Sequence, residues 1–278
     1  MNKLRIAVLI SGGGTNLQSM LERARDGTLA AQIAVVASDR VDAYGLVRAR
    51  QAGVPTHVVD YQSHLRGASI SSPGNTPQVD LRELDRKQRI LRHPDPEQRL
   101  RRLASLVLAE QELIDLLNHY QPDYVCLAGF MRLLTPYFLH HFNGPSEHRV
   151  VNIHPALLPA FPGEHGYEDT FAYGCKWGGI TVHFVDEGED SGPIIAQAVY
   201  PIWPDDDLEK IRRRGLGLEY EIYPQCINWL AAGQVLLCRG VGDRRQVVIT
   251  DPAYAQILTG WLQKAFARTQ LFRPTAET

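Results

Sequence analysis

The first part of the chain alternates short apolar runs with amphipathic stretches. Residues 4–10, 33–38 and 56–59 are apolar runs of the length expected for buried strands. Helical stretches separate them, one from about residue 17 and one over residues 43–52. Strands joined in this way indicate right-handed crossovers between parallel neighbours. We therefore predict an α/β fold, a doubly wound and mostly parallel sheet with helices on both faces, whose ligands bind outside the carboxyl ends of the strands.

The pattern breaks between residues 64 and 102. Residues 69–77 contain Ser, Pro, Gly and Asn without periodicity, and residues 81–102 are rich in Arg, Asp and Glu but are interrupted by His93-Pro-Asp-Pro. We predict an insertion at 64–102, made of a polar loop and one charged helix over residues 81–91. Its arginines can instead approach nucleic acid or another acidic ligand. Interleaved acidic residues and the lack of aromatic stacking partners favour a solvated surface.

Strand and helix patterns resume after the insertion and continue to residue 234. We predict a main α/β domain over residues 1–234 and a short C-terminal extension over residues 235–278. The further elements expected are helices over 103–119, 136–142 and 208–230, strands over 124–127, 150–153, 179–184, 194–200, 235–239 and 246–249, and a last helix over 253–267.

Two polar side chains stand at the end of the apolar run that begins at Val150. Side chains two apart on a strand share a face, so Asn152 and His154 point the same way, and Pro155 stops further pairing. An amide that donates hydrogen bonds, beside an imidazole that can carry a proton, suits a carbonyl oxygen that becomes an oxyanion. This pattern favours acyl transfer. The alternative is a histidine that ends a strand and an asparagine that begins a turn.

A glycine turn links the first apolar run to the first helical stretch. Glycine permits a positive φ and close backbone approach, and a helix start concentrates unpaired N–H donors. A phosphate is the expected ligand of Gly12, Gly13, Gly14, Thr15 and Asn16. A dinucleotide is less favoured, because Leu17 replaces the third glycine of its fingerprint and only Asp39 supports it. A P-loop would need a lysine that is missing, and a turn without a ligand remains an alternative.

Two further segments follow predicted strands at the same edge of the sheet. The apolar residues of 128–134 can form the wall of a flat heteroaromatic ligand, or they pack under the sheet as an ordinary loop. Residues 186–193 form an acidic loop that lacks the ligand spacing of an EF-hand calcium site. Its last carboxylate, Asp190, is followed at once by Ser-Gly-Pro and a strand, which fixes the side chain at the strand entry.

Composition restricts the classes of function. The chain has 278 residues and a formal net charge of -2, which gives no global field that attracts nucleic acid. No apolar run approaches the roughly 18 residues of a membrane span, and the apolar stretch near the amino end is too short for a signal peptide. The cysteines lack the C-x-x-C spacing of a zinc site. We expect a cytoplasmic protein without a metal and without nucleic acid or membrane partners.

The sequence carries four motifs in a fixed order. They are S-G-G-G-T-N-L-Q (11–18), A-G-F-M-R-L-L (128–134), N-I-H-P-A-L-L-P (152–159) and H-F-V-D-E-G-E-D-S-G-P (183–193). Together they resemble the glycinamide ribonucleotide formyltransferase family of purine synthesis, roughly over residues 4–234 apart from the insertion. The resemblance implies a fold of the formyltransferase type. It also implies 10-formyltetrahydrofolate as co-substrate and the amine of 5-phosphoribosylglycinamide as acceptor, both small molecules.

The resemblance implies roles for residues at matching positions. The family's catalytic asparagine, histidine and aspartate fall on Asn152, His154 and Asp190. Its phosphate-binding turn falls on residues 12–16, and the glutamate that holds the glycinamide falls on Glu219. The implied folate-binding residues are Met131, Arg132, Leu133, Leu134, Asn152, Asp186, Glu187, Gly188, Glu189 and Asp190.

Two positions depart from the family pattern. The arginine that meets the acidic tail of the folate cannot be aligned across the insertion, so Arg99, Arg101 and Arg102 are candidates only. Ala156 stands where the family commonly has serine, and we expect it to be tolerated because Pro155 already fixes the turn.

The resemblance also suggests a mechanism. Asn152 and protonated His154 donate hydrogen bonds to the oxyanion. Asp190 raises the pKa of His154 and accepts the proton that the amine releases. This scheme expects all three side chains to meet around one reacting carbon near the glycine turn.

Three rival functions share parts of this pattern. The hydrolase of 10-formyltetrahydrofolate and methionyl-tRNA formyltransferase carry the same central motif. A first strand at Leu4 and a short tail of mixed charge after Gly233 favour a small-molecule transferase over both. A dinucleotide-binding module that catalyses no reaction would explain the glycine turn. It would leave the combination of Asn152, His154 and Asp190 as a coincidence. The oligomeric state stays open, with a homodimer as one option.

Overall fold

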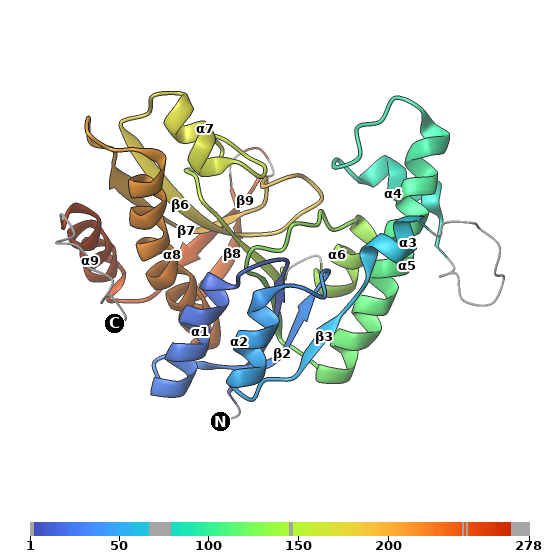
Figure 1. Ribbon diagram of the computed structural model, residues 1–278, viewed down its shortest axis with the longest axis horizontal. Coiled ribbons are helices and arrows are strands. Elements are labelled where there is room, and N and C mark those ends of the chain that lie inside the picture. Colours follow the sequence, from blue (N-terminus) through green and yellow to red (C-terminus); the bar gives the residue numbers. More distant parts are fainter. Residues whose placement is uncertain (1–2, 67–78, 145–146, 241, 243, 268–278) are drawn as a thin grey trace, which may run out of the picture.

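The computed structural model of the protein describes residues 3–66, 79–144, 147–240, 242 and 244–267. Its centre is a seven-stranded sheet in the order β3-β2-β1-β4-β5-β6-β7, and a second sheet pairs β8 with β9 (Figure 1). The predicted polar loop over residues 69–77 lies outside the described residues.

The elements follow one another as alternating strands and helices over most of the chain. The strands are β1 (Leu4–Ile10), β2 (Ala31–Ser38), β3 (Thr56–Val58), β4 (Tyr124–Leu127), β5 (Val150–His154), β6 (Trp177–Phe184), β7 (Ile194–Pro201), β8 (Val235–Arg239) and β9 (Arg245–Ile249). The helices are α1 (Thr15–Asp26), α2 (Tyr44–Gln51), α3 (Tyr61–Arg66), α4 (Leu81–Lys87), α5 (Pro96–Tyr120), α6 (Pro136–Phe142), α7 (Gly166–Ala172), α8 (Leu208–Ala231) and α9 (Tyr254–Phe266).

The large sheet is parallel from β3 to β5, and the strands β6 and β7 add an antiparallel edge. Parallel neighbours need crossover connections, which the helices between the strands provide. The strand order reverses at β1, so a topological switch point lies between β1 and β4. Ligands of such sheets bind beyond the carboxyl ends of the strands at this point. The predicted α/β fold with a mostly parallel sheet is confirmed.

Side chains of β1 alternate between two buried layers. Ile6, Val8 and Ile10 pack in the layer that contains α1, α2 and α8. Ala7 and Leu9 pack in the layer that contains α3, α5 and α6. This period of two is expected for a strand that is buried on both faces. Figure 1 shows α1, α2 and α8 on one side of the sheet and α5 and α6 on the other.

The inserted region has a small core of its own. Leu84 of α4 packs against Leu103 and Val107 of α5. The predicted helix over residues 81–91 is wrong at its end, because α4 stops at Lys87. The side-chain oxygen of Gln88 accepts the backbone N–H groups of residues 90 and 91 at 2.9 and 2.6 Å, so these groups no longer need helical partners.

Helix α5 begins earlier than the predicted start at residue 103. Asp95 caps it by accepting the N–H of Glu97 at 2.9 Å, and Pro96 occupies the first helical position. Proline is well tolerated there because its missing N–H would have no helical partner. The His93-Pro-Asp-Pro sequence, predicted as an interruption, is therefore the start of a helix.

The C-terminal extension packs on the sheet domain. Trp261 and Ala265 of α9 belong to the same buried core as β1 and α8. The Trp261 ring lies 5.9 Å from that of Trp229 on α8. The division at residue 234 stays a prediction. Across the described ranges, no helix is both long and apolar enough to cross a membrane.

Candidate active site

The carboxyl end of β5 presents Asn152 and His154 on one face of the sheet. Strand pairing places Asn152 opposite His183 and His154 opposite Thr181 of β6. Asp190, from the loop before β7, contacts both: Asn152 Nδ2 lies 3.4 Å from Asp190 Oδ1, and His154 Nδ1 lies 3.3 Å from Asp190 Oδ2. The structure thus brings together the three residues that the sequence analysis proposed as catalytic.

The backbone of the loop over residues 186–193 sets the direction of the Asp190 carboxylate. Asp190 has a φ of 49°, a left-handed conformation that aspartate tolerates better than most residues. Its Oδ2 accepts the backbone N–H of Gly163 at 2.8 Å. A Cβ on Gly192 would lie 1.9 Å from the carbonyl oxygen of Phe184, so only glycine fits there. The Asp-Ser-Gly-Pro sequence therefore holds the carboxylate at the strand entry.

Hydrogen bonding places the proton of neutral His154 on Nε2. This nitrogen donates to the carbonyl oxygen of Phe161 at 2.8 Å, while Nδ1 faces Asp190. Burial lowers the pKa of His154 below its ordinary value, and the charge of Asp190 opposes this only in part. Asp190 does raise the pKa of His154, as expected, but burial outweighs this contribution and the net shift is downward.

Asp190 has a lowered pKa in spite of its burial. Burial alone would raise the pKa, but the contacts with His183 and His154 and the N–H of Gly163 together outweigh it. In the free protein a carboxylate and an unprotonated imidazole nitrogen therefore face each other. Either can accept a proton, so the pair is suited to act as a general base.

His183 is a functional candidate that the sequence analysis did not assign. Its Nδ1 donates to the carbonyl oxygen of Phe184 at 2.8 Å, so Nε2 carries no proton when the ring is neutral. Nε2 lies 3.4 Å from Asn152 Nδ2 and 3.5 Å from Asp190 Oδ1. It can accept one amide hydrogen of Asn152 and orient the amide. The signal was present, since His183 opens the last of the four motifs.

A cavity of about 350 Å³, here called the central cavity, lies over this group. Its walls combine an apolar loop with the polar side chains of the site. Among its lining residues are the predicted site residues Met131, Arg132, Leu133, Leu134, Asn152, His154, Asp186, Gly188, Glu189, Asp190, Asn16 and Glu219.

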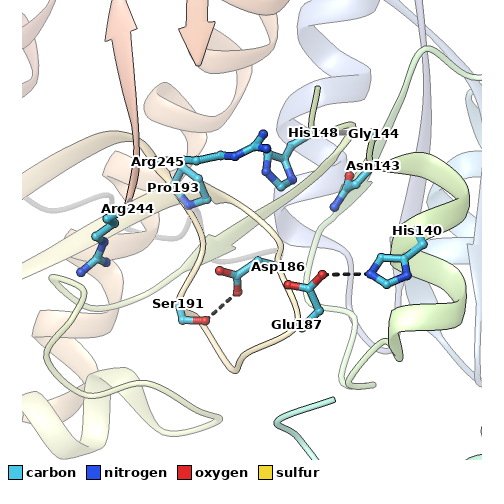
Figure 2. A pocket seen from close by; sticks show the side chains of 10 residues that line it. All are labelled: His140, Asn143, Gly144, His148, Asp186, Glu187, Ser191, Pro193, Arg244 and Arg245. Atoms are coloured by element: carbon cyan, nitrogen blue, oxygen red, sulfur yellow. Dashed lines mark hydrogen bonds and ion pairs between the residues drawn. The ribbon is translucent and has the colours of Figure 1, made fainter. Parts of the chain in front are cut away.

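Glu187 is predicted to bind folate, but it does not line the central cavity. Figure 2 shows it pointing towards His140, with which its carboxylate forms a hydrogen bond of 3.0 Å. The pocket on this side of the loop has a volume of about 540 Å³, and Arg244 and Arg245 also line it. Asp186 borders both spaces. The loop over residues 186–190 is thus a partition with a different environment on each side.

Three polar side chains form a buried group at the central cavity. Asn16 Nδ2 donates to Glu219 Oε2 at 2.6 Å, and the hydroxyl of Tyr167 donates to Glu219 Oε1. Burial raises the pKa of Glu219, although both hydrogen bonds oppose the shift. Asn16 was predicted to bind the substrate phosphate and Glu219 to bind the glycinamide. The structure places the two side chains in direct contact. Tyr167 is a functional candidate that the sequence does not predict, because its segment shows no helical period that would indicate the short helix α7.

The glycine turn leads into Asn16. Gly14 has a φ of 68°, and a Cβ on it would lie 2.7 Å from Gly45 Cα, so the backbones meet closely. Arg48, which the sequence analysis missed, donates from Nε to the carbonyl oxygen of Gly13 at 2.9 Å. A guanidinium beside the start of α1 suits a phosphate. Gly12, Gly13, Gly14 and Thr15 do not line the central cavity itself.

Arg132 is paired with Asp39. Its Nε lies 2.5 Å from Asp39 Oδ2, and its guanidinium lies 5.8 Å from the centre of the Tyr61 ring. The side chain of Asp39 is only 1% exposed. Asp39 was the one sequence feature that favoured a dinucleotide ligand. Its carboxylate is buried against Arg132, so it does not face a ribose. Within the described part of the chain, no three His, Cys, Asp or Glu side chains gather as metal ligands would.

A family model described as formyl transferase matches residues 4–227. The chain belongs to this family. One relative is the phosphoribosylglycinamide formyltransferase of Haemophilus influenzae, which is 36% identical over 234 residues. That match covers 84% of this chain and 90% of the relative.

Solved structures of family members have the same fold. Glycinamide ribonucleotide transformylase 1 from Symbiobacterium toebii gives a TM-score of 0.68 at 38% identity, and the match covers 89% of this chain and 94% of that chain. A formyltetrahydrofolate deformylase from Pseudomonas syringae gives a TM-score of 0.65 at 25% identity, with 90% and 67% covered. The fold alone therefore does not separate a transferase from a deformylase.

Proposed function

We propose that this enzyme transfers the formyl group of 10-formyltetrahydrofolate to the amine of 5-phosphoribosylglycinamide, a step of de novo purine (IMP) biosynthesis. The observation that carries the proposal is the meeting of Asn152, His154 and Asp190 on a cavity that Asn16 and Glu219 also line. A group suited to acyl transfer and a pair suited to hold an acceptor thus share one space. A deformylase needs only the first of these.

The central cavity fits a folate in its chemistry. Met131 and Leu133 are 52% and 45% exposed, so two large apolar side chains at the cavity are in contact with solvent in the free protein. A flat heteroaromatic ring against the loop over residues 129–134 would cover them. In this proposal Arg132, Leu134 and the loop over residues 186–190 complete the folate site.

The acceptor is held by its two ends. We assign its phosphate to the glycine turn of residues 12–16 with Arg48, where N–H donors and a guanidinium are close together. Glu219 holds the glycinamide amine. The Oδ1 atom of Asn16 is buried and has no hydrogen-bond partner among the described residues, so it is ready to accept one from a bound substrate.

The catalytic residues act on one carbon. Asn152 donates a hydrogen bond to the formyl oxygen as negative charge develops on it. His154 and Asp190 accept the proton that the attacking amine loses, and they return it to the folate nitrogen that leaves. Once protonated, the imidazolium of His154 places a positive charge beside the oxyanion. Its lowered pKa in the free protein is consistent with this scheme, because the imidazolium is needed only during the reaction.

Acceptor dependence tests the function. Purified enzyme is supplied with 10-formyltetrahydrofolate, with and without phosphoribosylglycinamide, and the release of tetrahydrofolate is monitored. The proposal predicts release only when the acceptor is present. Release at the same rate without the acceptor would assign the enzyme to the hydrolases instead.

The proposal extends to the setting of the enzyme. It places the activity in the cytoplasm and on small molecules. It includes no nucleic acid partner, because a formal net charge of only -2 gives no field that attracts nucleic acid. It treats residues 1–234 as the catalytic domain and leaves the choice between monomer and homodimer to a light-scattering measurement.

A further inference from the structure

Residues 128–135 form an irregular loop between β4 and α6, which we call the wall loop. Met131, Arg132, Leu133 and Leu134 of this loop line the central cavity. The backbone of an irregular loop is not held by a regular ladder of hydrogen bonds. The positions of these cavity residues therefore depend on contacts with other elements.

Buried polar groups hold both ends of the wall loop. Ser11 donates its N–H to the carbonyl oxygen of Gly129 at 2.9 Å, and its hydroxyl accepts the N–H of Met131 at 2.8 Å. The carboxyl group of Glu110 accepts the N–H of Thr135 at 2.7 Å. These contacts fix the main chain at the two ends of the loop.

Asp39 contacts the middle of the wall loop from a different strand. It follows β2, and β1 lies between β2 and β4 in the sheet. The side chain of Arg132 therefore reaches across the end of β1, and its Nε lies 2.5 Å from Asp39 Oδ2. The guanidinium also lies over the buried ring of Tyr61. One side chain of the loop is thus tied to a rigid part of the sheet.

The burial of Asp39 makes this ion pair costly to break. The side chain of Asp39 is 1% exposed, and its Oδ1 has no hydrogen-bond partner among the described residues. A buried carboxylate that loses its partner keeps an uncompensated charge, so Arg132 cannot easily move away. Asp39 does not line the central cavity, so any effect on a ligand acts through Arg132.

We propose that Asp39 is a positioning residue, which holds Arg132 and thereby keeps the wall loop in the shape that receives the folate ring. This inference rests on the proposed function, because it needs a folate in the central cavity. A wall that is formed in advance loses less conformational entropy on binding than a loop that becomes ordered around its ligand. The ion pair therefore lowers KM for the folate without taking part in formyl transfer.

A double-mutant cycle tests whether Asp39 and Arg132 act as one unit. Asp39→Leu keeps the branched shape of the side chain and removes both acceptor oxygens. Arg132→Met removes the donor, and the double variant leaves no buried charge unpaired, so it keeps a stable fold even where a single variant is unstable. Asp42→Leu is the control, because it changes an exposed aspartate of the same loop that pairs with Arg40 at the surface.

The expected signature is a selective change of one KM. Two side chains that become ordered only on binding lower the affinity by about 5- to 20-fold. We expect KM for 10-formyltetrahydrofolate to rise by about this factor in both single variants, and by the same factor in the double variant. KM for the acceptor and kcat stay within about threefold, and the control resembles the wild type.

Two kinetic results overturn the inference. One is a KM for the folate like that of the wild type in Asp39→Leu or in the double variant. The other is a double variant whose effect is the product of the two single effects, because the two residues would then act independently. A merely structural role of Asp39 would lower the midpoint of thermal unfolding and leave the KM of the remaining folded enzyme unchanged.

A binding measurement separates this inference from the proposed function. Calorimetry is performed with tetrahydrofolate on the wild type, Asp39→Leu and the control. Weaker binding in Asp39→Leu alone supports the positioning role. A wild type that binds no tetrahydrofolate refutes the proposed function, whereas equal binding in all three proteins refutes only this inference.

Discussion

Replacement of Asp190 by asparagine removes one negative charge with almost no change of shape. Asparagine tolerates a positive φ, and its side-chain oxygen can still accept the N–H of Gly163. His154 keeps its tautomer, because the carbonyl oxygen of Phe161 holds the Nε2 proton. Asp190→Asn therefore tests the charge of the carboxylate and little else.

The expected loss follows from the geometry of the pair. Asp190 Oδ2 lies 3.3 Å from His154 Nδ1, and the two side chains are 13% and 4% exposed. At an effective dielectric constant of about 20, a carboxylate at this distance stabilises an imidazolium by roughly 5 kcal/mol. Water and the remaining dipoles offset part of this. We expect kcat to fall by about 10²- to 10³-fold, or about 3 to 4 kcal/mol, which is in the range of general base catalysis.

The assay is steady-state release of tetrahydrofolate with the acceptor present. KM for both substrates should stay within about threefold, because the charge acts mainly in the transition state. Asp42→Asn is the control, since it removes an exposed aspartate that pairs with Arg40 at the surface. Thermal unfolding is compared for all three proteins. An Asp190→Asn enzyme with turnover near that of the wild type would remove Asp190 from the catalytic group.

Three further substitutions test other parts of the site and the core. Asn152→Ala should lower kcat by about 10²- to 10³-fold in single-turnover experiments while folate binding persists, and a loss below about tenfold would contradict its role at the oxyanion. Tyr167→Phe removes the hydroxyl that donates to Glu219 and should raise KM for the acceptor about tenfold or more; an unchanged KM argues against a role for Glu219 at the amine. Glu110, buried in α5, has a pKa raised to about 8 by burial, against hydrogen bonds from Thr135. In the folded protein Glu110 keeps its proton up to about pH 8, whereas in the unfolded chain it loses the proton near pH 4.5. The contribution of Glu110 to the free energy of unfolding therefore declines as the pH rises from about 4.5 to 8. Between pH 5.5 and pH 7.5 the free energy of unfolding, measured with urea, should fall by about 2 kcal/mol less in Glu110→Gln than in the wild type. The same pH dependence in both proteins would contradict this prediction.

The parallel sheet and the convergence of the site were predictable from local patterns. Apolar runs at a strand period and helical stretches between them define the order of elements, and parallel strands place their carboxyl ends at one edge. Asn152 and His154 share a face because of the strand period alone. Asp190 was predictable through its motif, since Ser-Gly-Pro after it leads directly into the next strand.

Other features depend on contacts between distant parts of the chain. Tyr167 is functional only because α7 packs against α8 and brings its hydroxyl to Glu219, and nothing in its own segment predicts this. The net pKa shift of His154 depends on how deeply the end of β5 is buried. The presence of Asp190 in a motif does not determine that burial. Arg48 reaches the glycine turn from α2.

The predicted helix boundaries in the insertion were wrong for a different reason. Charged residues and prolines suggested interruption at residues 93–96, yet Asp95 and Pro96 form a helix start whose stability comes from capping. In α4 the side chain of Gln88 competes for backbone N–H groups and ends the helix early. Both errors concern single hydrogen bonds at helix ends, which periodicity does not detect.

The central claim is that the formyl carbon moves to an amine held by Glu219 and the glycine turn. The most direct measurement follows a stable isotope in the formyl group of 10-formyltetrahydrofolate by NMR while the enzyme turns over phosphoribosylglycinamide. The account predicts that the label appears in the formamide of the phosphoribosyl product, in an amount equal to the tetrahydrofolate formed. Label that accumulates in free formate, with the acceptor left unformylated, would contradict it.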